Sequence, residues 1–317
     1  MRARAVLLLS IVVALAFPAF GVQRTFVSTA GDNTNTINNC SLAFPCRSFA
    51  SAMTVTTAGG EIVVLDSGGY GRVTIDKSVA IIAPAGIYAG ISVFSPDNGI
   101  DIDTPGVIVT LKGLTINGQG GNAGIDFRQG TRLTVENCEI ANVGGSSTAG
   151  IFARAPGATV VVKNTLIRDT AYVGIWVKQE TSGQKTTLIA DNTDVHDTSP
   201  WGIYVGGFAH LGTAEAYLTH VTVTGSASIG VTADSTTGDA TLVSVANSTI
   251  SNNGVGAYAV GAAAKLVVAT STLVRNVFTA LEQFPAATLL SRGDNTIHDN
   301  NSGGAQTGGT IGSLAPL

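Results

Sequence analysis

The chain has 317 residues, with 17 basic and 21 acidic side chains, a formal net charge of −4 and 39 glycines. Only 12% of its residues are charged, against roughly 25% in ordinary domains, which excludes a coiled coil or helical bundle, and its 44% of hydrophobic residues excludes a disordered chain. The acidic balance argues against a nucleic-acid partner, and a sequence poor in charge but rich in Ser, Thr, Asn and Gly indicates an all-β architecture.

Residues 1–21 have the order of segments that is typical of a secretory signal peptide. Arg2 and Arg4 precede an apolar run, and the run ends in small residues, with cleavage expected after Gly21. The alternative is a membrane anchor, but a span needs ~20 apolar residues and this run is shorter. We therefore expect a secreted, periplasmic or cell-surface protein that has no membrane contact after cleavage.

Residues 22–59 are predicted to form an N-terminal capping segment. Cys40 and Cys46 lie on either side of a short loop that contains Pro45, and in an oxidising compartment this spacing predicts a disulfide. Cys138 lies within a predicted strand and is expected to be a small buried side chain. Cysteine and histidine show no zinc spacing, so no metal and no cofactor is required, although a bound calcium is left open.

Residues 60–300 contain a repeat, in which a tetrapeptide that ends in an aliphatic residue recurs at intervals of 23–28 residues. Its copies begin at Gly113, Asn137, Asn164, Asn192, His220, Asn247, Thr270 and Asp294. An alternating apolar stretch precedes most copies, and a Gly-aliphatic strand such as Gly124-Ile125 follows them. Each repeat therefore holds three short strands that are separated by Gly and Asn turns.

A unit of this size cannot bury its apolar face alone, but stacked units share a continuous core. The repeat therefore predicts a parallel β-helix, a solenoid with three strands per coil and about ten coils, each rising by about 4.8 Å. The Gly-rich segment 301–317 is expected to be a C-terminal tail or closing cap.

Asparagine recurs at the first position of the tetrapeptide, where a tight turn joins two strands. Asparagine tolerates the left-handed backbone that such a turn needs. Stacked at one position per coil, the amides can hydrogen-bond along the column. We therefore expect a structural asparagine ladder that consists of Asn137, Asn164, Asn192 and Asn247.

The repeat resembles the right-handed parallel β-helix of the pectate-lyase-like superfamily over roughly residues 60–300. The segment from Thr25 to Met53 is similar to the start of many secreted β-helix proteins, in which a short strand and an amphipathic helix cap the first coil. The resemblance implies a right-handed coil. It also implies that substrates lie along the face of the Gly-aliphatic strands.

In each Gly-aliphatic strand, the residue after the aliphatic position is expected to point outward. Neighbouring coils carry aromatic residues there and cations two positions further on: Phe152, Trp176, Tyr204, Arg128, Arg154 and Lys178. Aromatic faces stack on sugars and cations pair with carboxylates, so we expect a monomer that binds an extended, acidic polysaccharide along this face. The alternative is that the aromatic residues only stabilise adjacent coils or lie under loops, which favours a non-enzymatic, adhesin-like rod.

Asp101 and Asp126 are predicted to lie one coil apart on the same face. Stacked carboxylates have one pKa raised while the other group stays ionised, as an acid with a nucleophile or base requires. The segment around Asp126 partly resembles the pectinesterase segment that holds the nucleophilic aspartate, although it departs from it at two positions and the chain lacks the Gln-Asp-Thr motif. The resemblance implies Asp126 as nucleophile, Asp101 as acid and Arg128 or Arg154 beside the oxyanion. A carbohydrate esterase or lyase is therefore the alternative function, unless residues 91–94 form the first strand of that coil instead.

A second candidate cluster follows two tetrapeptides, and it consists of Arg168, Asp169, His196 and Asp197. Two carboxylates and an imidazole one coil apart could bind a cation or exchange protons. The alternative is that the aspartates cap turns, because Asp hydrogen-bonds its own backbone two residues on. The chain lacks the motifs of polygalacturonases and of pectate lyases, so it matches no characterised enzyme subfamily.

Overall fold

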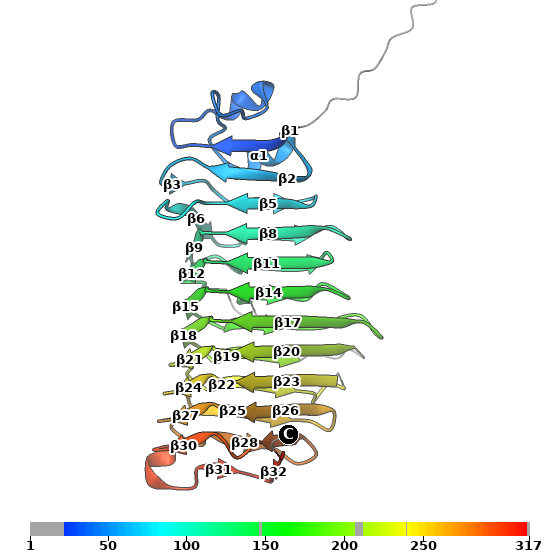
Figure 1. Ribbon diagram of the computed structural model, residues 1–317, viewed down its shortest axis with the longest axis vertical. Coiled ribbons are helices and arrows are strands. Elements are labelled where there is room, and N and C mark those ends of the chain that lie inside the picture. Colours follow the sequence, from blue (N-terminus) through cyan, green and yellow to red (C-terminus); the bar gives the residue numbers. More distant parts are fainter. Residues whose placement is uncertain (1–21, 146–147, 207–211, 239, 316–317) are drawn as a thin grey trace, which may run out of the picture.

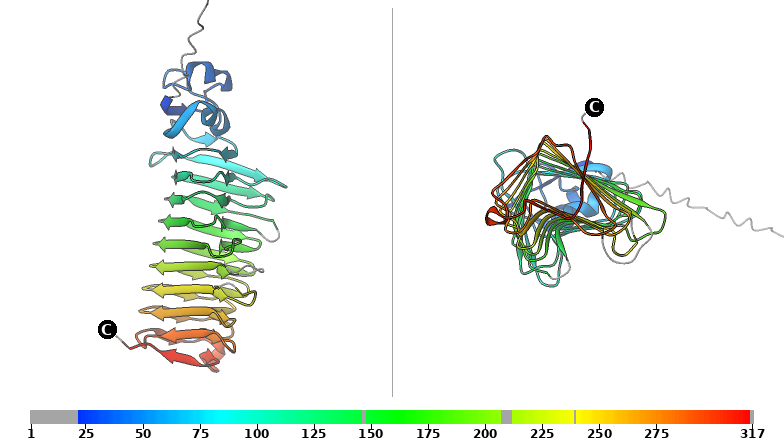
Figure 2. Two further views of the ribbon diagram at one scale, coloured as in Figure 1. Left: turned by 90° about the vertical axis from the view of Figure 1, so that its right-hand side faces the viewer. Right: turned by 90° about the horizontal axis from the view of Figure 1, so that it is seen from below.

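The computed structural model describes residues 22–145, 148–206, 212–238 and 240–315, so the predicted signal peptide lies outside the described residues. The chain forms a parallel β-helix whose coils stack along one axis (Figure 1). Seen along that axis, three sheets form the sides of a triangle (Figure 2). Over the described ranges the sheets have 12, 10 and 10 strands, in agreement with the predicted three strands per coil and about ten coils.

Sheet A holds the alternating apolar stretches that precede the tetrapeptides. Its strands are β1 (Val22–Val27), β2 (Thr56–Val64), β5 (Val79–Ile82), β8 (Ile108–Lys112), β11 (Arg132–Glu136), β14 (Thr159–Lys163), β17 (Lys185–Asp191), β20 (Thr213–Thr219), β23 (Ala240–Ala246), β26 (Ala264–Ala269), β29 (Thr288–Ser291) and β32 (Ile311–Ser313).

Sheet B holds the tetrapeptides. Its strands are β3 (Gly68–Gly69), β6 (Ala89–Phe94), β9 (Leu114–Gln119), β12 (Glu139–Ala141), β15 (Leu166–Thr170), β18 (Asp194–Thr198), β21 (Thr222–Thr224), β24 (Thr249–Ser251), β27 (Thr272–Val274) and β30 (Thr296–His298).

Sheet C holds the Gly-aliphatic strands. Its strands are β4 (Val73–Ile75), β7 (Ile100–Asp103), β10 (Ile125–Gln129), β13 (Ala149–Ala153), β16 (Val173–Val177), β19 (Trp201–Gly206), β22 (Ile229–Asp234), β25 (Val255–Val260), β28 (Leu281–Gln283) and β31 (Thr307–Gly308).

The core is a continuous column of inward-facing aliphatic side chains from all three sheets. In one coil, Leu133 of sheet A, Ile140 of sheet B and Ile151 of sheet C are fully buried. Each such side chain contributes about 1.5–3 kcal/mol when it is removed from water. Because successive coils add their side chains to the same column, the stack is stable where one coil would not be.

The glycines of the Gly-aliphatic strands are required by a close approach at the corner between sheets B and C. A Cβ atom on Gly124 would lie 2.6 Å from the carbonyl oxygen of Gly150 and 2.6 Å from Cγ2 of Ile140. The equivalent atom on Gly174 would lie 2.5 Å from Cγ1 of Val195. The recurrent glycine is therefore a packing requirement of the coils that carry it.

The asparagines of the predicted ladder occupy left-handed turns between sheets A and B, with φ of 53°, 48°, 48° and 49° at Asn137, Asn164, Asn192 and Asn247. One amide-to-amide hydrogen bond joins two of them, from Nδ2 of Asn192 to Oδ1 of Asn164 at 2.7 Å. His220 takes the same turn position between Asn192 and Asn247, also with positive φ.

A second asparagine ladder, which was not predicted from the sequence, lies inside the corner between sheets B and C. Asn253, Asn276 and Asn300 are at most 1% exposed. Nδ2 of Asn253 donates to Oδ1 of Asn276 at 3.1 Å, and Nδ2 of Asn276 donates to Oδ1 of Asn300 at 2.9 Å. Each amide satisfies its neighbour in a site that water does not reach, as buried polar groups require.

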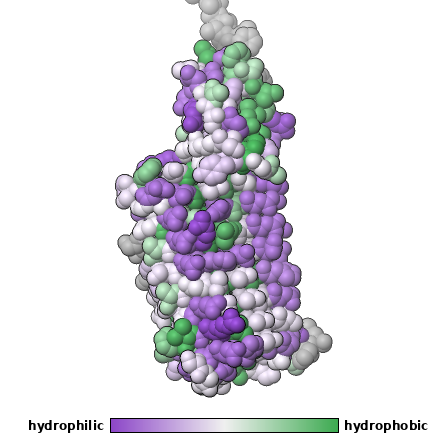
Figure 3. Space-filling model, turned by 90° about the vertical axis from the view of Figure 1, so that its left-hand side faces the viewer, coloured by the Kyte–Doolittle hydropathy of each residue, from purple (hydrophilic) through white to green (hydrophobic). Residues whose placement is uncertain are grey.

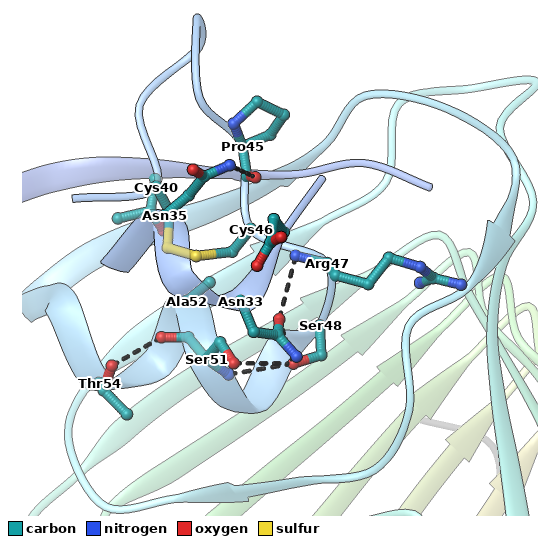
Figure 4. The surroundings of a disulfide bond; sticks show 12 residues. Asn33, Asn35, Cys40, Pro45, Cys46, Arg47, Ser48, Ser51, Ala52 and Thr54 are labelled. Carbon is teal, nitrogen blue, oxygen red and sulfur yellow. Dashed lines mark hydrogen bonds between the residues drawn. A yellow bond between two sulfur atoms is a disulfide. The ribbon is translucent and has the colours of Figure 1, made fainter. Parts of the chain in front are cut away.

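The N-terminal end is closed by a loop that the Cys40–Cys46 disulfide joins, as predicted (Figure 4). Asn33 Oδ1 accepts hydrogen bonds from the backbone N–H of Arg47 and from Oγ of Ser48, both at 3.1 Å. Ser48 then caps the helix that follows by accepting from the backbone of residue 51 at 3.2 Å.

Two helices belong to this cap, η1 (Asn33–Asn38) and α1 (Phe49–Val55). Phe49 of α1 is fully buried, and its ring centroid lies 5.3 Å from that of Tyr70. Burial favours the neutral form of Asp66, but hydrogen bonds from Tyr70 and from residues 28 and 29 outweigh it and lower the pKa of Asp66 to about 2. The cap is thus tied to the first coil by packing and by a charged hydrogen-bond acceptor.

Cys138 is 4% exposed, as predicted, and burial raises the pKa of its thiol to about 11. At the other end of the rod, a short helical turn, η2 (Asn301–Gly303), follows the buried ladder, and Gln306 hydrogen-bonds Asn300 there. None of the helices in the described ranges is long and apolar enough to cross a membrane.

Candidate functional site

The outer face of sheet C carries one column of side chains in register. Its members, one from each successive coil, are Asp101, Asp126, Phe152, Trp176, Tyr204, Thr232, Tyr258 and Glu282. We call this set the sheet C column. Residues 89–94 form β6 of sheet B, so Asp101 and Asp126 are direct neighbours in sheet C.

The aromatic residues in the middle of this column are covered. Phe152, Trp176 and Tyr204 are 6%, 3% and 7% exposed, and they form a cluster separate from the main core. The ring centroids of Phe152 and Trp176 lie 4.6 Å apart in a stacked arrangement. Tyr172 and Trp201, from the corner between sheets B and C, pack against the same cluster.

Little of the three rings is therefore open to a sugar in this structure, and their role in substrate binding stays a prediction. Bulky side chains in adjacent strands pack on one another, because the strands are only about 4.8 Å apart. The alternation of the strand sets the direction in which a side chain points, but its neighbours decide whether it is covered.

The predicted cations also pack on these rings. Cζ of Arg154 lies 4.4 Å from the centroid of the Phe152 ring, and Nζ of Lys178 lies 5.8 Å from that of Trp176. Such contacts are cation–π interactions. Nε1 of Trp176 donates to the backbone oxygen of Gly206 at 3.0 Å, so its polar edge is satisfied.

Charged residues form one continuous set of ion pairs along the N-terminal half of this face, and we call it the sheet C network. It consists of Arg72, Asp97, Asp101, Asp103, Asp126, Arg128, Arg154, Lys178 and Glu180. The four cations therefore face five carboxylates. Every cation that the sequence placed on this face has at least one carboxylate within 4.0 Å.

Asp126 is the centre of the network, and its side chain is 5% exposed. Oδ2 accepts from Nε of Arg128 at 2.8 Å and from Nη2 of Arg154 at 2.9 Å, while Oδ1 accepts from Nε of Arg154 at 3.1 Å. Asp101 accepts from Nη2 of Arg128 at 3.2 Å and from Nδ2 of Asn98 at 2.7 Å. Both oxygens of Asp126 are thus held by guanidinium groups.

This geometry affects the predicted acid and nucleophile pair. The Arg128 guanidinium bridges Asp101 and Asp126, so it compensates the repulsion on which such a pair depends. The hydrogen bond to Asp126 raises the pKa of Arg128, burial opposes it, and the charges of the nearby carboxylates add to the rise. The catalytic roles of Asp101, Asp126 and Arg128 stay a prediction.

A polar hollow of about 370 Å³ lies beside the network. Its lining residues are Asp103, Arg128, Gln129, Arg154, Pro156, Glu180 and Thr181. Four of these residues were not among the predicted site residues, namely Asp103, Gln129, Glu180 and Thr181. Their only signal was their place at or just after the ends of sheet C strands, where loops leave toward sheet A.

The second predicted cluster lies on sheet B, where Arg168 and His196 are neighbours in register. Asp169 and Asp197 have φ of 53° and 50°, so both occupy left-handed turn positions. Nη2 of Arg168 donates to Glu139 at 2.7 Å. In the described part of the chain, no three His, Cys, Asp or Glu residues are grouped so that they could hold a metal ion.

Comparison with known proteins gives a family and a fold. The model of the family described as right handed beta helix region matches residues 27–244. A search of curated proteins finds no match.

Among solved structures, pectate lyase Pel9A is similar with a TM-score of 0.57 and 16% identity, over 90% of this chain and 81% of that one. XylC in complex with xylose gives a TM-score of 0.40 and 10% identity, over 86% and 69%. The Dettilon tailspike protein (gp208) gives 0.40 and 13%, over 90% and 68%. At 16% identity the similarity to the pectate lyase is one of fold.

Proposed function

The chain belongs to the right-handed β-helix family, and from this premise we propose that it is an exported rod that binds an extended polysaccharide along the outer face of sheet C. The observation that carries the proposal is the polar hollow beside the sheet C network. The fold is similar to that of a pectate lyase, an enzyme that acts on a polysaccharide, and this likeness agrees with the choice of ligand class.

The chemistry of the hollow suits sugar hydroxyls, which both donate and accept hydrogen bonds. Arg128 and Arg154 offer donors, Asp103 and Glu180 offer acceptors, and the Gln129 amide offers both. Ion pairs already hold most of these side chains in place. A ligand would therefore lose little affinity to the ordering of side chains.

Recognition by hydrogen bonds, rather than by free cations, is the form of binding that we propose. The expectation of an acidic polysaccharide depended on Arg128, Arg154 and Lys178 as available cations. Each of them has a carboxylate partner, so a glycan carboxylate would have to compete with Asp126 or Glu180.

Export is part of the same proposal. Residues 1–21 have the pattern of a signal peptide, and a disulfide persists in oxidising compartments. We propose that the exported rod acts as a monomer, without a cofactor and without a membrane or nucleic-acid partner.

A second candidate function is a non-enzymatic, adhesin-like rod, and the covered aromatic cluster favours it. In that case the outer face of sheet C only stabilises the stack. Catalysis by an esterase or lyase mechanism has less support, because arginines hold both oxygens of Asp126.

Affinity electrophoresis in native gels tests the proposal, with uncharged glucans, mannans and xylans and with acidic polygalacturonate and alginate. We expect at least one of them to retard the wild type, and the double variant Asp103→Ala with Gln129→Ala to bind about tenfold more weakly. Gln23→Ala with Asp194→Ala is the matched control, since it removes an amide and a carboxylate from sheets A and B.

Two results would overturn the proposal. The first is that no polysaccharide retards the wild type, which would leave the structural rod as the better account. The second is that the hollow variant is retarded as strongly as the wild type.

A further inference from the structure

Near the C-terminal end of the rod, the aromatic side chains of the sheet C column are no longer fully covered. Tyr258 of β25 is half-buried, and Phe284, which directly follows β28, is 45% exposed. Their ring centroids lie 5.6 Å apart, with an angle of 56° between the ring planes. This pair therefore presents aromatic surface on the same face on which Phe152, Trp176 and Tyr204 are covered.

The same end of the rod carries more apolar surface. Val277 and Phe278, in the turn before β28, are 62% and 59% exposed. On the face shown in Figure 3, which is hydrophilic over much of its length, a small hydrophobic patch lies near the C-terminal end and a larger one near the N-terminal cap. Contiguous apolar surface of this kind marks interaction sites, whereas single exposed apolar residues do not.

Two carboxylates flank the aromatic pair. Glu282 is the register neighbour of Tyr258, and Asp234 lies in the adjacent coil. Glu282 accepts from Oγ1 of Thr279 at 3.0 Å, and Asp234 accepts from the hydroxyl of Tyr204. Over the described ranges, neither carboxylate has an ion-pair partner, in contrast to the carboxylates of the sheet C network.

The charge at this end selects the class of ligand. An aromatic face stacks on the apolar face of a sugar ring, and fixed carboxylates accept hydrogen bonds from hydroxyls. A sugar that carries its own carboxylate would be repelled by Glu282 and Asp234. Burial and then the charges of Glu282 and Asp234 raise the pKa of Tyr258, which agrees with an anionic surrounding.

We propose that Tyr258, Phe284 and Glu282 form a second contact site for the polysaccharide, and that this polysaccharide is uncharged. The inference rests on the proposed function and names its substrate class. The site lies four coils from Arg154, or about 19 Å along the rod. A short oligosaccharide reaches one of the two sites, and a longer one reaches both.

The test compares two double variants by affinity electrophoresis and by titration calorimetry with the uncharged and acidic polysaccharides named above. Tyr258→Ala with Phe284→Ala is expected to weaken binding of an uncharged polysaccharide about tenfold. Tyr217→Ala with Phe94→Ala is the matched control, because it removes two exposed aromatic residues from sheets A and B. We expect the control to bind like the wild type.

Conservative variants separate a binding role from a structural one. Tyr258→Phe with Phe284→Tyr keeps both rings, and we expect it to restore binding to within about threefold of the wild type. Oligosaccharides shorter than about 19 Å are expected to bind at least tenfold more weakly than longer ones, because they cannot use both sites.

The outcomes distinguish this inference from the proposed function. If the hollow variant loses binding and the aromatic variant does not, the second site is refuted and the proposed function stands. If only acidic polysaccharides bind the wild type, the uncharged class is refuted and the face remains the binding surface. If neither variant changes binding, or nothing binds, both proposals fail.

Discussion

The middle and the C-terminal end of the outer face of sheet C use the same strand positions in opposite ways. Trp176 and Tyr258 occupy one column, yet Trp176 is 3% exposed while Tyr258 is half-buried beside the open ring of Phe284. In the middle, aromatic neighbours in adjacent coils and Tyr172 and Trp201 at the corner cover the rings. At the end, the neighbours in the column are the small Thr232 and the charged Glu282.

The charges differ in the same way. In the middle and N-terminal part, every predicted cation has a carboxylate partner, and Asp126 is enclosed by two arginines. At the end, Asp234 and Glu282 are held by hydroxyl donors. In the first region the charged side chains are therefore held mainly by one another, whereas in the second the carboxylates have hydrogen-bond donors but, over the described ranges, no cation.

The largest expected effect is on the covered ring. Trp176→Ala is expected to lower the free energy of unfolding by about 3–5 kcal/mol, because it leaves a cavity between Phe152 and Tyr204. Phe284→Ala is expected to change it by less than about 1 kcal/mol. Denaturant unfolding of both variants measures this difference. Equal losses in the free energy of unfolding would contradict the contrast between covered and open rings.

The next effect concerns the centre of the network. Asp126→Ala leaves Arg128 and Arg154 without their shared partner, and we expect a loss of roughly 2–4 kcal/mol, below the cost for a fully buried pair because both arginines reach solvent. Asp103→Ala, at the exposed edge, is expected to cost less than about 1 kcal/mol. A folded Asp126→Ala protein of unchanged stability that lost a hydrolytic or lyase activity would instead support the esterase or lyase alternative.

The contrast between covered and open positions extends to the two asparagine columns. Asn276→Ala removes the shared acceptor of a buried ladder, so we expect a loss of about 1–3 kcal/mol. Asn192→Ala, in the exposed left-handed turn, is expected to cost about 1 kcal/mol through backbone strain. Thermal unfolding of the two variants measures both losses of stability. A larger loss for Asn192→Ala than for Asn276→Ala would mean that the outer asparagine column contributes more to stability than the buried ladder.

The smallest effect is expected at alkaline pH. Burial, the hydrogen bond to Asp234 and the charge of that carboxylate raise the pKa of Tyr204 above its usual value of 10.0. When the pKa of a group is higher in the folded than in the unfolded protein, the group stabilises the fold fully at a pH below its unfolded pKa. This stabilisation is lost as the pH rises from the unfolded pKa toward the folded pKa. We therefore expect stability to fall above about pH 10, and to fall less steeply in Tyr204→Phe. Identical slopes in the two proteins would contradict this role of Tyr204.

The fold could be predicted from the sequence because the repeat shows where its strands and turns lie. The apolar stretches, the tetrapeptides and the Gly-aliphatic strands became sheets A, B and C in the expected order. The glycines recur because a Cβ atom would clash at each of these positions, and the recurrent asparagines mark left-handed turns. Local chemistry decides these features, so a single sequence shows them.

The surface of the site depends on contacts between residues that are far apart in the chain. The sequence around Trp176 does not indicate that Trp201 packs in the same cluster. It also does not indicate that Glu180 pairs with Arg154. The buried ladder left only a weak signal, an asparagine three residues after the aliphatic anchor at 253, 276 and 300. Coverage and ion pairing follow from stacking geometry, which the repeat alone does not specify.

The most direct test of the central claim is a crystal structure of the protein with a bound uncharged oligosaccharide long enough to span four coils. We predict sugar density along the outer face of sheet C, from the hollow lined by Gln129 to the rings of Tyr258 and Phe284, with Trp176 still covered. Density confined to sheet A or sheet B, or sugars stacked on an uncovered Trp176, would contradict the account.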